Sequence, residues 1–247
     1  MKEKLTINTD PISRMVNEYR AFFAQNTFET YMDNGKEIVD MLWIPNEEMK
    51  NKEIWFTADT HFGSERTLQL SKRDRLFKND VKYMNANILQ GFHNAAEKSH
   101  SHGKEAILFH LGDIGEMDYY MKQIKIWYDK IYLITGNYEE SPEFSLSDDE
   151  LKEYGISSIF HEKTLVHFGG ELLALAHKPT DCKELIENTT GCKYGLFGHI
   201  HGRQMIKPFG IDVGVDAQHF APINLEDVKF FLNAIEKGYY DQDVWCQ

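Results

Sequence analysis

Short apolar runs alternate with longer segments of helical periodicity through the first half of the chain. The runs predict strands at 54–58, 106–111 and 131–134, and the periodic segments predict helices at 80–98 and 117–128. A repeated strand, helix, strand order favours parallel pairing of the strands through crossover helices. This half is therefore predicted to form a parallel sheet covered by helices.

The second half of the chain carries more strands and fewer helices. Two apolar runs flank Gly169-Gly170, which is typical of a hairpin turn. The predicted strands lie at 163–167, 171–176, 194–197, 203–206 and 211–215. A final amphipathic helix is predicted at 225–236 with Asn224 as its N-cap. The whole pattern indicates an α/β fold that contains antiparallel as well as parallel strands.

The first 50 residues precede the first of these strands and have a helical pattern of their own. Apolar residues spaced three and four apart mark one helix face: Ile12, Met15, Val16, Tyr19, Phe22 and Phe23. Asp10-Pro11 fits an N-cap followed by proline at the first helical position. We predict an N-terminal helical extension over 1–50 and a main domain over 51–247. The extension could pack on the core, cover the site or pair subunits in a homodimer.

Composition narrows the classes of protein that fit. No apolar stretch is long enough to cross a bilayer and no signal-peptide apolar region follows Met1, so we expect a cytoplasmic protein without a membrane partner. The three cysteines lack the spacing of a metal site or a disulfide framework. A net charge of −12 argues against binding of extended duplex nucleic acid.

Metal-binding residue types follow the predicted strands in five short motifs. The motifs are Asp59-Thr60-His61, Gly112-Asp113, Gly136-Asn137-Tyr138-Glu139, His177 and Gly198-His199-Ile200-His201-Gly202. Imidazoles, carboxylates and an amide oxygen suit manganese, iron or zinc and suit copper(I) poorly. Two such ions that share a carboxylate can hold both the attacking and the leaving oxygen of a phosphoryl transfer. Asp113 is the natural bridging carboxylate.

The order Asp-x-His, Gly-Asp, Gly-Asn-x-Glu, isolated His and Gly-His-x-His resembles the calcineurin-like metallophosphoesterase superfamily over about residues 54–216. The phrases at 55–63, 111–113 and 213–216 resemble its small stand-alone bacterial and phage branch. The resemblance implies a four-layer αββα sandwich, in which two mixed β-sheets are flanked by helices. Residues 51–247 would then form the metallophosphoesterase domain.

The resemblance also implies a metal centre and a reaction. Its two divalent ions would be manganese most readily, with iron, zinc or nickel as alternatives, and Asp113 would bridge them. One ion would be held by Asp59, His61 and His201, and the other by Asn137, His177 and His199. A hydroxide bridging the metals would attack a phosphodiester or phosphomonoester. The substrate would be a small phosphorylated molecule or a nucleotide.

One position departs from the family pattern. Tyr138 stands where the family has a histidine that helps bind or protonate the leaving oxygen. Glu139 is the acidic residue after it, which in the family orients that histidine. We assign Tyr138, Glu139 and Asp113 to catalysis. A tyrosine hydroxyl, with an ordinary pKa of about 10, donates a hydrogen bond more readily than a proton. The departure therefore weakly favours a diester, whose leaving group can be activated.

Substrate contacts are predicted at Arg66, Arg73 and Lys178. The basic run 72–75 falls where related proteins carry an arginine that could bind a phosphate, although a solvated basic loop explains it equally well. Two other functions stay open besides a metal-dependent phosphoric ester hydrolase. One is a catalytically weak or silent binding or scaffold protein, and the other is a nuclease acting on short single-stranded nucleic acid.

Overall fold

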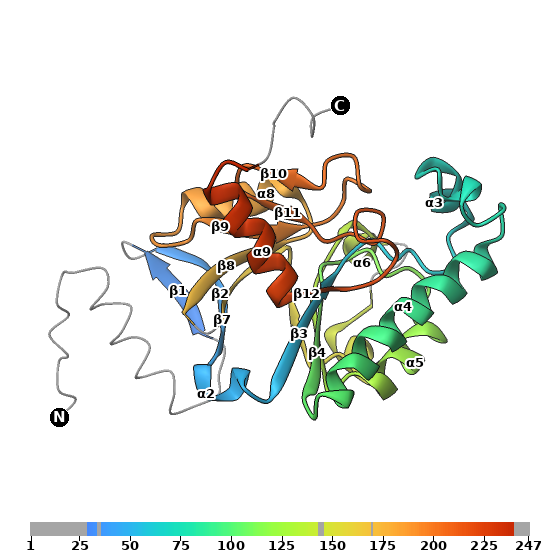
Figure 1. Ribbon diagram of the computed structural model, residues 1–247, viewed down its shortest axis with the longest axis horizontal. Helices are drawn as coiled ribbons and strands as arrows, with labels where there is room; N and C mark the ends of the chain where they lie inside the picture. The colour runs from blue at the N-terminus through green and yellow to red at the C-terminus, as the bar shows by residue number, and fades with distance from the viewer. Residues whose placement is uncertain (1–28, 34–35, 143–145, 169, 240–247) are drawn as a thin grey trace, which may run out of the picture.

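Two β-sheets lie face to face in the middle of the protein, and helices cover their outer surfaces (Figure 1). The structure is a computed structural model that describes residues 29–33, 36–142, 146–168 and 170–239. One sheet has seven strands in the order β1-β2-β7-β8-β9-β11-β10, and the other has five in the order β12-β3-β4-β5-β6. Both sheets contain parallel and antiparallel pairs, which confirms the predicted α/β sandwich of two mixed sheets.

The five-stranded sheet comes mainly from the first half of the chain. Its strands are β12 (Ile223–Asn224), β3 (Lys52–Thr57), β4 (Glu105–His110), β5 (Lys130–Ile134) and β6 (Ser158–Phe160). Strands β3 to β6 are parallel, and β12 adds an antiparallel edge. The predicted crossover helices are α4 (Val81–Ser101) and α5 (Tyr120–Trp127). Asp80 caps α4 by accepting hydrogen bonds from the amides of Lys82 and Tyr83.

The seven-stranded sheet joins the second half of the chain to a segment before β3. Its strands are β1 (Glu29–Asp33), β2 (Lys36–Ile44), β7 (Lys163–Phe168), β8 (Glu171–Ala176), β9 (Tyr194–Phe197), β11 (Gly210–Asp212) and β10 (Ile206–Lys207). The predicted hairpin is confirmed, because β7 and β8 are antiparallel. Helix α8 (Pro179–Glu187) connects β8 to β9, which are parallel.

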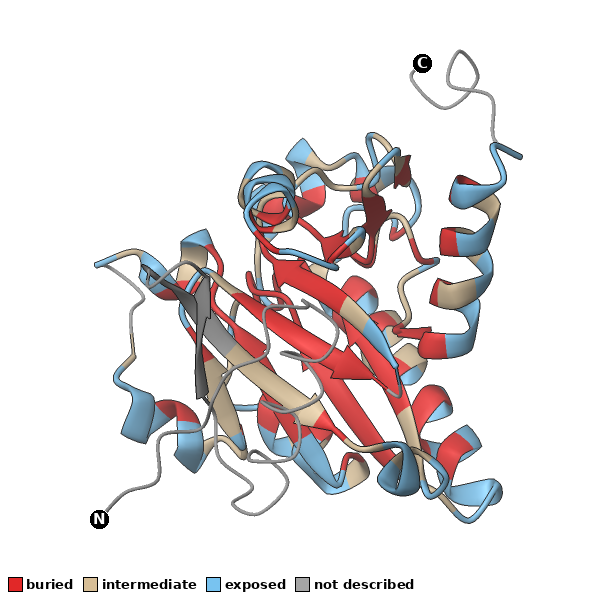
Figure 2. Cartoon of the chain, turned by 90° about the vertical axis from the view of Figure 1, so that its left-hand side faces the viewer, coloured by how far each residue is buried: buried red, intermediate tan, exposed pale blue. Residues whose placement is uncertain are grey.

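Alternation along the strands separates the layers. Inward-facing side chains fill the space between the sheets, where Phe56 packs on Phe109 and Phe168 at ring-centroid distances of 5.5 and 5.6 Å. The outer face of the smaller sheet packs on α4 and α5, and that of the larger sheet packs on α8. Figure 2 shows the buried residues concentrated in the strands and on the helix faces turned toward them. Helix α9 (Leu225–Glu236) begins at the predicted cap.

The segment before β3 differs from the predicted helical extension where it is described. Residues 1–28, with the helix expected from Asp10-Pro11, lie outside the described residues. From residue 29 onward the chain forms β1, β2 and the short helix α2 (Asn46–Met49). Strand β2 pairs in parallel with β7 from Met41 to Ile44, so this stretch belongs to the larger sheet. The division of the chain at residue 50 stays a prediction.

Short elements account for the other differences. The strands predicted at 203–206 and 211–215 are shorter and shifted, and form β10 and β11. The helices α3 (Glu65–Leu70), η1 (Arg73–Arg75), α6 (Asn137–Glu140) and α7 (Asp148–Glu153) are too short to show a clear period. Within the described ranges, no helix has both the length and the apolar character needed to span a bilayer.

Candidate metal centre

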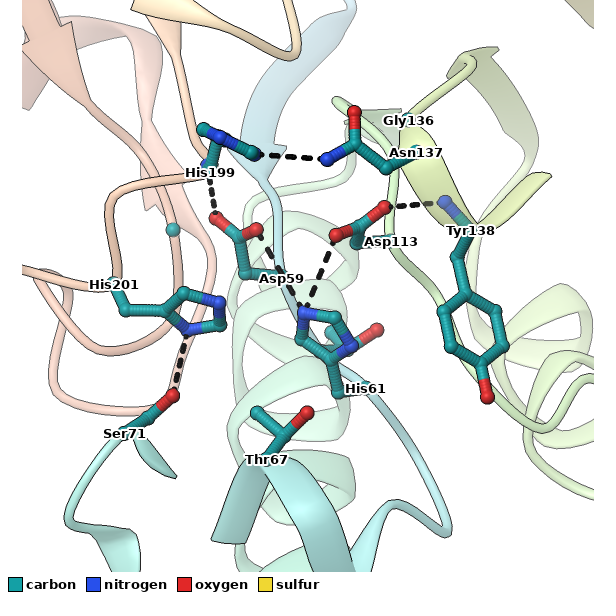
Figure 3. A network of polar contacts seen from close by, with 12 residues as sticks. Asp59, His61, Thr67, Ser71, Asp113, Gly136, Asn137, Tyr138, His199 and His201 are labelled. Atoms are coloured by element: carbon teal, nitrogen blue, oxygen red, sulfur yellow. Dashed lines mark hydrogen bonds and ion pairs between the residues drawn. The ribbon is translucent and has the colours of Figure 1, made fainter. Parts of the chain in front are cut away.

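The five motifs meet at one edge of the sandwich, where strands from both sheets end. Asp59 and Asp113 follow β3 and β4, and Asn137 is the first residue of α6 after β5. His177 follows β8, and the segment 199–201 follows β9. The carboxyl ends of parallel strands are the usual place for ligands in α/β sheets. Figure 3 shows side chains from four of these motifs turned toward one another.

Asp113 lies between two histidines. Its Oδ2 is 3.4 Å from Nε2 of His61 and 3.4 Å from Nε2 of His177. Nδ1 of His199 lies 3.2 Å from the same His177 nitrogen and 3.3 Å from Nδ2 of Asn137. The central position of Asp113 is the one that a bridging carboxylate needs.

Two groups of these side chains could each hold a metal ion. The first consists of Asp59, His61 and His201, and the second of Asp59, Asp113 and His177. The first group is the set that the sequence predicts for one ion. The second contains His177 from the other predicted set, together with both carboxylates. The structure thus brings all seven predicted ligands together, and their roles as ligands stay a prediction.

Several buried atoms of the predicted ligands have no hydrogen-bond partner among the described residues. Oδ1 of Asp59 and both ring nitrogens of His61 have no hydrogen bond within the described part of the chain. Burial raises the pKa of Asp59 to about 6 and lowers that of His61 to about 3. Buried polar atoms without partners are rare and costly. Neutral imidazole and carboxylate oxygen are also the donors that divalent manganese, iron or zinc accept, so these residues fit a metal.

Backbone strain is concentrated at the same place. Asp59, His61, Asp113, His199 and His201 all have positive φ, between 46° and 71°. The left-handed conformation costs about 1 kcal/mol or more for a residue with a side chain, and such strain persists mainly at functional sites. Five of the seven predicted ligands share this conformation.

Close packing of the loops requires glycine beside the ligands. A Cβ at Gly198 would lie 2.5 Å from Oδ2 of Asp59, and one at Gly136 would lie 2.6 Å from Oδ1 of Asp113. Gly112 has a φ of +84° and abuts the backbone of Gly136. The glycines in the sequence motifs therefore let the backbone approach the two carboxylates.

Hydrogen bonds fix which ring nitrogen faces the site. Nδ1 of His177 donates to the carbonyl of Leu111 at 2.7 Å, so its Nε2 is directed toward Asp113. Burial alone would lower the pKa of His177, but Asp113 and Asp59 raise it to about 9. A metal bound at Nε2 would therefore displace a proton.

The two residues of the motif after Asn137 have separate roles. The Glu139 carboxylate is buried and accepts hydrogen bonds from the amides of Asp113, Ile114 and Gly136 at 2.8 to 2.9 Å. It therefore positions the Asp113 loop, and its predicted catalytic role stays a prediction. The amide of Tyr138 donates to Oδ1 of Asp113 at 2.8 Å. Its ring lines the site cleft and extends away from Asp113 (Figure 3).

Arg73 was predicted to contact substrate, but it does not line the cleft. It is only 1% exposed, and its Nε and Nη2 donate to the two carboxylate oxygens of Asp216 at 2.7 and 2.6 Å. Nη2 also donates to the carbonyl of Asp59 at 2.7 Å, and Nη1 to that of Thr60 at 3.1 Å. With these donors engaged, Arg73 cannot bind substrate. It anchors the Asp59 loop instead, and Asp216 in turn contacts Nδ1 of His201 at 2.8 Å.

The other two predicted substrate contacts lie beside the ligands. Arg66 is exposed and lines the cleft, which has a volume of about 900 Å³ and also contacts His61, Asp113 and His201. Lys178 is half-buried and lines a smaller pocket with His177 and Asn137. Their binding of substrate stays a prediction.

Sequence reasoning assigned no role to two buried carboxylates. Asp212 accepts hydrogen bonds from the amides of Gly202 and Gly214 at 3.1 and 2.8 Å, and burial raises its pKa to about 8. Burial would also raise the pKa of Asp216, but the hydrogen bonds with Arg73 and His201 lower it to about 2. For Asp216 the available signal was the phrase at 213–216, which is part of the family resemblance, and Asp212 lies just before that phrase.

Comparisons with known proteins support the fold. No protein-family model matches the sequence, and neither does any curated protein. A protein of unknown function from Aquifex aeolicus aligns with a TM-score of 0.54 at 18% identity, over 73% of this chain and 100% of its own. A novel archaeal phosphodiesterase aligns at 18% identity over 66% of this chain and 82% of its own, with a TM-score of only 0.41. The chain therefore shares its fold with the Aquifex protein.

Proposed function

We propose that the chain is a calcineurin-like metallophosphoesterase that hydrolyses phosphate esters with two divalent ions, manganese being favoured. The observation that carries the proposal is the convergence of the seven predicted ligands. Within the described residues, their buried atoms include Oδ1 of Asp59 and both ring nitrogens of His61, none of which has a hydrogen bond. Bound divalent ions would activate water and neutralise the charge that develops on the phosphoryl oxygens.

The chain's own groups hold this site in shape. The amide of Tyr138 orients one oxygen of Asp113, which leaves the other toward His61 and His177. The amide of His199 donates to Oδ2 of Asp59 at 2.8 Å, which directs Oδ1 toward the first ligand group. Such preorganisation lowers the reorganisation that a charged transition state requires.

The cleft limits the size of the substrate. A volume of about 900 Å³ is in the range of sites for small ligands, which supports a small phosphorylated molecule or nucleotide. Tyr138 lines this cleft, and a tyrosine hydroxyl is a poorer proton donor to a leaving group than the imidazolium of a histidine. A diester with an activated leaving group is therefore weakly favoured over a monoester.

Metal-dependent hydrolysis of chromogenic esters tests the proposal. Chelator-stripped protein would be given manganese, iron, zinc, nickel or no metal, with bis-p-nitrophenyl phosphate beside p-nitrophenyl phosphate. We expect turnover only with metal, and loss of both metal and turnover in Asp113→Ala and His199→Ala. His161→Ala is the matched control, because His161 is exposed and does not line the cleft. Metal binding without turnover of any ester would favour a scaffold role.

A further inference from the structure

The cleft over the metal site has the opposite charge to the rest of the protein. Arg66, Lys72 and Arg203 line it and are exposed, whereas Asp113 is the one carboxylate among its described lining residues. The chain as a whole carries a net charge of −12. A local excess of cations on an acidic protein concentrates anions at that place.

A second cavity differs from the cleft, because its cationic side chains are paired with carboxylates. It has a volume of about 700 Å³ and lies between α9 and the strands β8 and β9. Its two lysines form ion pairs with glutamates of the same cavity, Lys193 with Glu236 at 3.3 Å and Lys229 with Glu226 at 3.0 Å. In the described part of the chain, Arg66, Lys72 and Arg203 form no such ion pair.

The three cations are carried by anchored segments. Lys72, with a φ of 60°, directly precedes Arg73, which is fixed to Asp216 and to the Asp59 carbonyl. Arg203 follows Gly202, whose amide donates to the buried Asp212 carboxylate at 3.1 Å. The anchors are therefore the same buried groups that hold the ligand loops.

Arg66 lies in the first turn of α3, on the same side of the site. Ser64 caps this helix by accepting a hydrogen bond from the amide of Thr67 at 3.1 Å. Ser71, which follows α3, lies 3.1 Å from Nδ1 of His201, so the segment that carries Arg66 and Lys72 contacts the ligand loop (Figure 3).

We propose that Arg66, Lys72 and Arg203 form a subsite for a second phosphate group of the substrate, outside the ester that is cleaved. The inference rests on the proposed phosphoesterase function. The reacting phosphate would be neutralised by the two divalent ions, so it does not by itself account for three further cations. A terminal phosphate carries a charge of about −1.5 to −2 at neutral pH and three acceptor oxygens. The preferred substrate is thus a diester that bears an additional phosphomonoester.

A matched pair of substrates tests this subsite. Thymidine 5′-(p-nitrophenyl phosphate) and the same compound with a 3′-phosphate share the cleaved bond and the leaving group. We expect the 3′-phosphate to lower KM about tenfold, because each exposed ion pair contributes up to about fivefold. Lys72→Ala and Arg203→Ala should raise KM only for the 3′-phosphorylated ester. Arg75→Ala is the control, since Arg75 is exposed in the same segment but does not line the cleft.

Two kinetic outcomes would overturn the subsite. Equal KM values for the two esters in the unaltered protein would show that the second phosphate is not recognised. An equal rise in KM for both esters in the variants would show that the cations bind the reacting phosphate.

Failure of the proposed reaction would look different, because neither ester would then be hydrolysed with any metal. The subsite would in that case be tested by calorimetric binding of thymidine 3′,5′-bisphosphate and thymidine 5′-monophosphate to the manganese-loaded protein. The subsite would be supported if the protein bound the bisphosphate more tightly than the monophosphate and if Lys72→Ala abolished that difference. Equal affinity of the unaltered protein for the two nucleotides would overturn it.

Discussion

Replacing Arg73 by methionine should destabilise the protein strongly, although the substitution removes none of the predicted metal ligands. Methionine replaces the apolar stem of the arginine side chain but cannot donate to Asp216 or to the carbonyls of Asp59 and Thr60. Removing one partner of a buried ion pair leaves an uncompensated charge and costs about 3–5 kcal/mol. We expect a loss of that size in the free energy of unfolding at pH 7.

The loss should depend on pH. The pKa of Asp216 is lowered from 3.8 to about 2 in the folded protein, which corresponds to roughly 2 kcal/mol of stability. Because the folded pKa is depressed, this stability is present above about pH 4 and is lost as the pH falls toward 2. Without Arg73, burial would raise the pKa of Asp216, so its protonation would relieve the uncompensated charge. The two proteins should therefore converge in stability as the pH falls.

Urea unfolding followed by circular dichroism, with chelator present, measures both effects. The comparison would be made at pH 7 and near pH 4, with Arg75→Met as the control because Arg75 is exposed in the same short helix. We expect the control to change stability by less than about 0.5 kcal/mol. A loss below about 1 kcal/mol for Arg73→Met, or a loss that does not change with pH, would refute the reasoning.

Three further predictions concern the core, the metal and the leaving group. Phe109→Ala should lower the free energy of unfolding by about 3–5 kcal/mol in the same urea titration, since the Phe109 ring is fully buried between the sheets. The control Phe230→Ala should have a small effect, because the Phe230 side chain is 69% exposed. Asp216→Asn should weaken manganese binding about 10- to 100-fold in calorimetry, because the carboxylate orients His201, and unchanged affinity would remove that role. Tyr138→His should raise turnover of alkyl phosphate esters more than that of nitrophenyl esters, since only poor leaving groups need a proton donor, and equal gains would contradict it.

The sequence by itself determined the strands of the central region and the residues placed at their ends. Runs such as 106–111 and 131–134 are almost continuously apolar, which is the local pattern of a strand that is buried on both faces of its sheet. Because strand ends gather at one edge of a sheet, motifs far apart in the chain could be predicted to meet. Asp59, Asp113 and His177 do meet there.

Only the tertiary structure decided what the basic run does. Arg73 and Lys72 are neighbours in a polar segment, and local sequence gives them the same expectation. Arg73 is buried and Lys72 is exposed, because Arg73 pairs with the buried carboxylate of Asp216, which lies 143 residues away in the sequence. Strand β2 was likewise missed, since its partner β7 lies about 120 residues further along the chain. Partners brought together by folding set burial, charge pairing and strand register, and no local pattern contains them.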